Sequence, residues 1–228
     1  MTTAGLVIRI GDVEALCRPS GALWVEAARA LIVADLHFEK ASAYAARGQM
    51  LPPYDTRETL ARLEAETRAT EPSLLIFLGD SFHDASAEDR LPPDEARRIG
   101  ALAAGRHLVW IVGNHDEEGP RRLPGECLPS FDLAGLRLVH EPCPRAAPGE
   151  IAGHLHPCAK VRGPGGTVRR RCFVTDGERL VLPAFGALAG GLNIRDEAFR
   201  PLFSRRPLAG VLGRGRVHPV AWASLSDD

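Results

Sequence analysis

Leu31-Ile-Val-Ala-Asp-Leu-His37 is an apolar run that ends abruptly in an acid and a histidine. Two later stretches repeat this pattern: Leu74-Leu-Ile-Phe-Leu-Gly-Asp80 and Leu108-Val-Trp-Ile-Val-Gly-Asn-His-Asp116. Short continuous apolar runs of this kind are typical of strands that are buried on both faces of a parallel sheet. Polar residues directly after such strands meet at the carboxyl edge of the sheet, where catalytic groups are usually found.

Two helical patterns separate the three runs, one over 56–69 and one over 94–104. Asp55 and Glu58 have the spacing of a capping box at the start of the first helix, and Gly105 follows the end of the second. The order strand, helix, strand, helix, strand predicts a largely parallel sheet that is covered by helices.

The rest of the chain has the pattern of short strands separated by turns. These strands are expected over 6–10, 13–17, 22–25, 136–140, 150–154, 171–175 and 179–183, with turns at 163–166 and 176–177. Two sheets packed face to face with helices outside would accommodate both halves, which predicts an α/β fold: a four-layer α-β-β-α sandwich of two mixed sheets. Residues 1–228 are expected to form one domain, with a short polar tail over about 224–228 that frays.

The composition is that of an ordinary globular protein, with 45% hydrophobic and 25% charged residues. No apolar run is long enough to span a membrane, and the start lacks the layout of a secretory signal, so we expect a cytoplasmic protein without a membrane partner. The five cysteines form no Cys-x-x-Cys pair and are interpreted as free thiols.

The formal net charge of −1 gives no bulk electrostatic reason to bind nucleic acid. Positive charge is nevertheless almost all arginine, because Lys40 and Lys160 are the only lysines. Arginine is the better planar partner for phosphate. Clusters at 97–98, 121–122, 169–171, 205–206 and 214–216 are equally compatible with a phosphate-binding surface and with an ordinary solvated one.

The polar residues after the expected strands form an ordered set of metal-ligand motifs. In chain order they are Asp35-x-His37, Gly79-Asp80, Gly113-Asn114-His115-Asp116, His140 and Gly153-His154-x-His156. Oxygen and imidazole ligands without thiolate suit Mn²⁺, Fe or Zn²⁺ and disfavour a structural zinc site. Two residues apart on a strand, Asp35 and His37 would point to one face and share a metal, as would His154 and His156. The glycines beside the ligands allow tight turns and close approach.

Together these motifs resemble the calcineurin-like metallophosphoesterase superfamily and its fold. The resemblance implies that Asp35, His37 and His156 hold one metal, that Asn114, His140 and His154 hold the other, and that Asp80 bridges both. Two such cations hold a hydroxide between them for in-line attack on phosphorus. His115 would not be a ligand; with Asn114 it would bind substrate, and it would stabilise the transition state or protonate the leaving group.

One position departs from the commonest pattern of the superfamily, where Gly-Asp-x-x-Asp is usual. This chain has Gly79-Asp80-Ser-Phe-His83-Asp84, and the histidine resembles the nuclease branch of the superfamily. His83 is therefore expected to be catalytic or to bind phosphate, the alternative being that it only supports a ligand. Asp84 is a weaker candidate, and Asp116 either orients His115 or has a role at a helix N-terminus or in a turn.

A closer resemblance spans most of the chain and points to the bacterial ligase-associated metallophosphoesterases. It rests on 31–41, 48–56 and 182–193, including Leu182-Pro-Ala-Phe-Gly186. These proteins are encoded beside a DNA ligase and a helicase, so the resemblance implies functional association with both. It also implies a manganese-dependent phosphodiesterase and single-strand DNA endonuclease in DNA repair, although the residues alone do not select DNA as the substrate. Manganese is thus the expected metal, with Fe or Zn²⁺ as alternatives.

Several alternatives remain open at the level of sequence. A phosphomonoesterase, a protein phosphatase or a cyclic-nucleotide phosphodiesterase would use the same metals. A non-catalytic scaffold is disfavoured because every ligand is present, and a hydrolase of other bonds because Asn-His after a strand fits phosphoesterases. Residues 38–40 and Tyr54 could reach the substrate or serve only packing and surface, while 182–186 with 190–193 could wall the cleft or only turn. The oligomeric state is not predicted.

Overall fold

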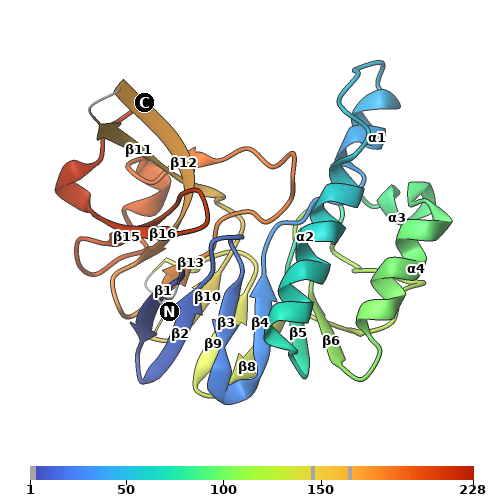
Figure 1. Ribbon diagram of the computed structural model, residues 1–228, viewed down its shortest axis with the longest axis horizontal. Coiled ribbons are helices and arrows are strands. Elements are labelled where there is room, and N and C mark those ends of the chain that lie inside the picture. Colours follow the sequence, from blue (N-terminus) through green and yellow to red (C-terminus); the bar gives the residue numbers. More distant parts are fainter. Residues whose placement is uncertain (1–3, 145–146, 164–165) are drawn as a thin grey trace.

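The computed structural model describes residues 4–144, 147–163 and 166–228 of the chain (Figure 1). Two mixed sheets pack against each other, and this confirms the predicted fold class. A core of side chains from both sheets lies between them, including Ile32, Ile76 and Val109 from one sheet and Leu138 and Phe173 from the other. Within the described ranges, we find no helix with both the length and the apolar character needed to span a bilayer.

The first sheet has the strand order β1-β2-β3-β4-β5-β6-β7. Its first strands form the expected antiparallel meander, whereas β4 to β7 are parallel. The bounds are β1 Leu6–Ile10, β2 Val13–Cys17, β3 Leu23–Val25, β4 Ala30–Val33, β5 Leu74–Leu78, β6 His107–Ile111 and β7 Glu126–Leu128, with a short 3-10 turn, η1 Glu26–Ala28, before β4. The parallel strands β4, β5 and β6 therefore all end at the same edge.

Among the described residues, four α-helices lie on the outer side of this sheet, on the right of Figure 1, and the last three of them pack directly on it. They are α1 Lys40–Ala45, α2 Asp55–Thr70, α3 Ala87–Arg90 and α4 Pro93–Leu102. Leu60 and Ile99 pack with Phe77 and Trp110 in this outer core. The predicted capping box is wrong: Tyr54 is the N-cap of α2 and makes no side-chain cap, because the Asp55 carboxylate instead accepts a hydrogen bond from the backbone N–H of Ala41 at 3.0 Å.

The second sheet has the order β14-β11-β12-β13-β10-β9-β8, and β15 and β16 extend it beside β12. The bounds are β8 Ser130–Leu133, β9 Leu136–Val139, β10 Glu150–Ala152, β11 Pro157–Gly163, β12 Gly166–Thr175, β13 Leu180–Val181, β14 Leu192–Asn193, β15 Leu208–Leu212 and β16 Val217–Ala221. Its outer layer contains two 3-10 helices, η2 Glu197–Phe199 and η3 Trp222–Ser224. Of the turn expected over 163–166, the central residues 164–165 lie outside the described ranges.

The C-terminal tail packs against the second sheet, so the expectation that it frays is wrong. Leu225 is 7% exposed and belongs to the outer core of this sheet. The Ser226 N–H donates to the Lys160 carbonyl at 2.9 Å, and the Asn193 side-chain amide donates to the Ser226 carbonyl at 3.0 Å. These contacts join the tail to residues that are distant in the sequence, so the polar composition of the tail does not predict them.

Candidate metal centre

The seven residues expected to be metal ligands converge at the edge where the parallel strands end. Asp35 and His37 follow β4, Asp80 follows β5 and Asn114 follows β6. The second sheet supplies the three others after β9 and β10: His140, His154 and His156. Neither sheet alone provides the site, so the packing of one sheet on the other assembles it.

The first group of donors consists of Asp35, His37 and His156, whose ligand atoms all lie within 4.8 Å of one another. Nε2 of His37 is 3.1 Å from Nε2 of His156. That His156 nitrogen is also 3.4 Å from Oδ1 of Asp35. The three ligand atoms are close enough together to bind one cation. Neutral imidazole nitrogens and carboxylate oxygens are common metal ligands in proteins.

The second group is centred on His140. Its Nε2 lies 3.1 Å from Oδ1 of Asn114, 3.2 Å from Nδ1 of His154 and 3.3 Å from Oδ1 of Asp80. The other carboxylate oxygen of Asp80, Oδ2, is 3.9 Å from Nε2 of His37 in the first group. Asp80 therefore faces both groups, one oxygen toward each.

The strand geometry expected from residue spacing is wrong for both pairs of ligands, although Asp35 and His37 do lie in one donor group as expected. Asp35 and His37 lie beyond the end of β4 and have positive φ angles of 53° and 47°; His154 and His156, at 67° and 46°, are likewise left-handed. Such residues do not alternate like those of a strand, so His154 and His156 face different groups. Left-handed backbone costs a non-glycine residue roughly 1–2 kcal/mol, and strain of this kind tends to be stored at functional sites.

Glycines beside the ligands permit the close packing of the two groups, as predicted. A Cβ at position 113 would lie 2.2 Å from Oδ1 of Asp80. At position 79 it would lie 2.1 Å from Nδ1 of His140. Since real Cβ atoms do not approach so closely, any side chain there would displace a member of the site.

The electrostatics of the site favour cations. Asp35 is fully buried and Asp80 is 2% exposed. Burial acts to raise the pKa of Asp80, but the hydrogen bond and charge of His140 and the His115 backbone N–H outweigh it, so that this pKa falls to about 2. Burial conversely acts to lower the pKa of His140, yet the two carboxylates raise it to about 9. Buried negative charge of this strength is stabilised by positive charge.

His83 and His115 lie beside the first group. Ring nitrogens of His37, His83 and His115 are within 4.8 Å of one another. Nδ1 of His115 is 2.8 Å from the His83 carbonyl oxygen, which directs Nε2 to within 3.9 Å of the Asp80 carboxylate. Burial, followed by the charges of Lys40 and His115, lowers the pKa of His83 to about 4, so this imidazole is neutral at physiological pH.

The sequence does not predict one of the neighbours of His83, which is Tyr44. The Tyr44 ring lies 5.8 Å from the His83 ring, at an interplanar angle of 36°. Tyr44 belongs to α1, a six-residue helix that no pattern in the sequence predicts. Tyr54, by contrast, is 63% exposed at the start of α2.

The flanking acids have structural contacts. Asp116 is buried. Its carboxylate accepts hydrogen bonds from the backbone N–H groups of Gly113 at 2.9 Å, Ser81 at 2.8 Å and Phe82 at 3.1 Å. Burial raises the pKa of its carboxyl group to about 6 despite these bonds. Asp84 forms an ion pair with Arg90 at 2.8 Å.

The other candidate segments have different places in the structure. Some of their residues pack in the protein core, and others lie beside the metal-ligand loops. Phe38 is buried in the outer core, and Glu39 accepts a hydrogen bond from the Thr56 hydroxyl at 2.9 Å. The segment 182–186 pairs with the ligand loop: the Gly186 N–H donates to the Asp35 carbonyl at 3.1 Å. Its interpretation as a wall of the site is therefore supported by direct contact.

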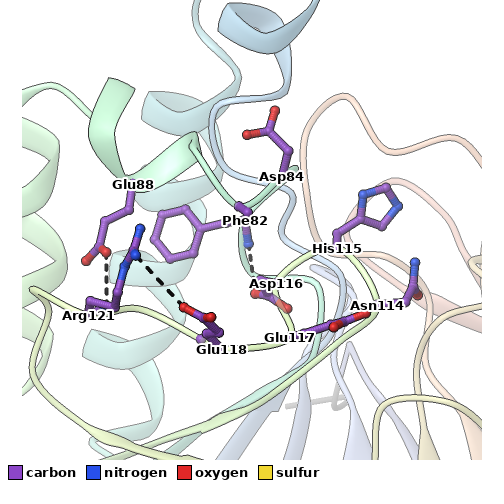
Figure 2. Close-up of a pocket in the computed structure, with 11 residues that line it drawn as sticks. Phe82, Asp84, Glu88, Asn114, His115, Asp116, Glu117, Glu118 and Arg121 are labelled. Carbon is purple, nitrogen blue, oxygen red and sulfur yellow. Dashed lines mark hydrogen bonds and ion pairs between the residues drawn. The ribbon is translucent and has the colours of Figure 1, made fainter.

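A cavity of about 440 Å³ opens on the His115 side (Figure 2). Acidic side chains dominate its polar lining: Asp84, Glu88, Asp116, Glu117 and Glu118. Figure 2 shows His115 and Asn114 at one end of this cavity and the paired Glu88 and Arg121 at the other. The cavity on the His115 side of the metal-ligand groups is therefore lined mainly by acidic residues.

Comparison with known proteins agrees with this geometry. Residues 28–171 match the family described as calcineurin-like phosphoesterase. The crystal structure of Pseudomonas putida nuclease MPE is similar, with a TM-score of 0.72 and 28% identity over 95% of this chain and 100% of that chain. YfcE, a phosphoesterase from E. coli, shares 16% identity over 84% of this chain and 98% of its own, with a TM-score of 0.42. A search of curated proteins gave no significant match.

Proposed function

Because the chain belongs to the calcineurin-like phosphoesterase family, whose members hydrolyse phosphoester bonds with two divalent metals, we propose that it is a manganese-dependent phosphodiesterase acting on single-stranded DNA in DNA repair. The nuclease from Pseudomonas putida, similar over 95% of the chain, supports a nucleic-acid substrate. Manganese, single strands and repair rest on the resemblance of the flanking sequence to ligase-associated metallophosphoesterases.

We assign the metal ligands from the two donor groups. Asp35, His37 and His156 would hold one cation. Asn114, His140 and His154 would hold the other, with Asp80 between them. When bound, the two cations would lower the pKa of a water molecule and neutralise the phosphate oxygens.

The remaining residues would act on the substrate itself. In its imidazolium form His115, whose side chain is 39% exposed, would donate the Nε2 proton to the leaving oxygen or a hydrogen bond to a phosphate oxygen. Its ring is held by Nδ1 against the His83 carbonyl, which leaves Nε2 toward the centre. His83, stacked beside it and neutral, would contact the same phosphate. The observation that carries the proposal is the pair of donor groups that share Asp80.

Circular single-stranded DNA tests the substrate directly. Wild-type protein with Mn²⁺ should convert the circle to linear strands, since only an endonuclease can cut a substrate without ends. Asp80→Asn serves as the inactive control because it removes a charge that faces both groups. Intact circles after prolonged incubation would exclude the endonuclease.

A pair of small substrates separates the diesterase from the phosphomonoesterase alternative. Bis-p-nitrophenyl phosphate has the diester charge, whereas p-nitrophenyl phosphate is a monoester. We expect a higher kcat/KM for the diester with Mn²⁺. A preference for the monoester would contradict the diesterase and favour a phosphatase.

A further inference from the structure

The segment 184–192 connects the metal centre to a neighbouring arginine-rich surface. On its inner side the Phe185 N–H donates to the Ala34 carbonyl at 2.8 Å, next to Asp35. Leu192 N–H donates to the carbonyl of His156 at 3.1 Å. This segment therefore contacts the backbone at two of the expected ligands of the first metal group.

Arginines of β12 hold the outer side of the same segment. Arg171 donates to three of its carbonyls, those of Ala184 at 2.9 Å, Ala187 at 3.3 Å and Ala189 at 2.8 Å. Arg169 donates to the Gly191 carbonyl at 2.7 Å. The arginine side chains are thus separated from the metal-ligand loops by the thickness of one chain segment.

A cavity of about 450 Å³ lies over these arginines. Its lining residues are Cys158, Arg169, Arg170, Arg171, Ala189, Gly190, Gly191 and Leu212. Arg169 forms an ion pair with Asp228 at 3.3 Å, across side chains that are about half exposed. For Arg170 and Arg171, none of the described carboxylates comes within ion-pair distance, so the cavity keeps a net positive charge.

The opposite flank of the metal centre has the reverse charge. The acidic cavity beside His115 lies near α3, whereas the arginine cavity lies on β12, and Figure 1 places these two elements on opposite sides of the molecule. A polyanion that crosses the metal centre would be repelled from the acidic side and attracted to the arginine side. Guanidinium groups are also well suited to phosphate because they are planar and donate several hydrogen bonds.

We propose that Arg169, Arg170 and Arg171 form a subsite for the phosphates of the nucleic-acid strand that flank the scissile phosphodiester. The subsite rests on the proposed function, since it requires a strand that continues beyond the metal centre. Arg171 contributes positive charge and also holds the segment 184–192 in place. Arg170 is exposed, and its one described hydrogen bond goes to the Arg169 carbonyl, so its guanidinium can still bind a phosphate of the nucleic acid.

Steady-state kinetics on two substrates test this subsite. Arg170→Gln and the double variant Arg169→Gln/Arg170→Gln are compared with wild type on single-stranded DNA and on bis-p-nitrophenyl phosphate, at several salt concentrations. The small diester has no flanking phosphate, so it reports on the metal centre alone. Arg9→Gln, on the exposed face of β1, is the matched control for loss of one positive charge.

We expect Arg170→Gln to lower kcat/KM on DNA by about threefold to tenfold relative to the small diester, mainly through KM. The slope of log kcat/KM against log salt should become shallower by about 0.7 for each phosphate that the variant no longer neutralises. A double variant whose DNA kinetics and salt slope match those of Arg9→Gln would overturn the subsite alone. Wild-type protein that hydrolyses the small diester but neither binds nor cuts DNA would overturn the proposed substrate as well.

Discussion

The imidazole rings of His83 and His115 are stacked, with centroids 5.3 Å apart and an interplanar angle of 21°. They come from loops after two neighbouring parallel strands, β5 and β6. If they act on one phosphate, His115→Ala should lower kcat on the small diester by roughly 100-fold or more, the usual size of a lost general acid. His83→Ala should have a smaller effect in the same direction, and metal content should stay at the wild-type value in both.

His107→Ala is the control for these variants, because His107 lies at the opposite end of β6, where its Nε2 is 3.3 Å from a carboxylate oxygen of Glu126. It should leave kcat unchanged. An unchanged kcat in His83→Ala would remove His83 from the catalytic residues.

Asp116 is predicted to stabilise the loops of the site without touching the substrate. Asp116→Ala removes the acceptor of three backbone N–H groups, those of Gly113, Ser81 and Phe82. Each unsatisfied buried donor costs about 1–3 kcal/mol. We therefore expect the free energy of unfolding, measured by urea denaturation with chelator present, to fall by several kcal/mol. A variant as stable as wild type would show that these bonds are not needed.

Gly186 is predicted to be required for the loop that carries Asp35. A Cβ at this position would lie 2.1 Å from the Leu36 carbonyl oxygen, so Gly186→Ala should displace the loop and weaken metal binding. Gly190→Ala is the matched control, because a Cβ there meets nothing within 4 Å. Calorimetric titration with Mn²⁺ measures the effect, and equal affinities of the two variants would contradict the predicted displacement.

The ion pair between Glu64 of α2 and Arg98 of α4, at 2.7 Å, is predicted to make stability depend on pH. The hydrogen bond from Arg98 is the main cause that lowers the pKa of Glu64 below its usual value of 4.5. A carboxyl group whose pKa is lower in the folded state stabilises the fold above the unfolded pKa, and this stability is lost as pH falls through the folded pKa.

Glu64→Gln should therefore lower the free energy of unfolding by up to about 1 kcal/mol near neutral pH, and by progressively less as the solution is acidified below about pH 4.5. Chelator-treated protein keeps metal binding out of this measurement. A Glu64 effect that does not vary with pH would contradict the ion-pair explanation.

The sequence predicts the composition of the site better than its geometry. Asp80 and Asn114 could be identified because each follows a glycine at the end of an apolar run, and parallel strands bring such ends together. The division of His154 and His156 between two groups could not be derived from spacing, since it depends on left-handed backbone that strand periodicity does not describe. In the structure His156 lies with Asp35 and His37, whereas His154 lies with Asp80 and His140.

Contacts between distant segments were also beyond sequence reasoning. The position of Tyr44 against His83 depends on a short helix without a distinctive pattern. The role of Arg171 depends on carbonyl groups of 184–189, which carry no side-chain signal. Both cases require the packing of the whole fold, whereas the metal motifs are local.

The proposed activity requires a centre that holds two cations in each chain, and the number of bound metal ions can be counted. Protein freed of metal, supplied with excess Mn²⁺ and desalted should contain about two ions per chain by elemental analysis. His154→Ala, which removes one donor of the second group, should retain about one. A wild-type chain that binds fewer than two ions at saturating Mn²⁺ would contradict the two-metal centre.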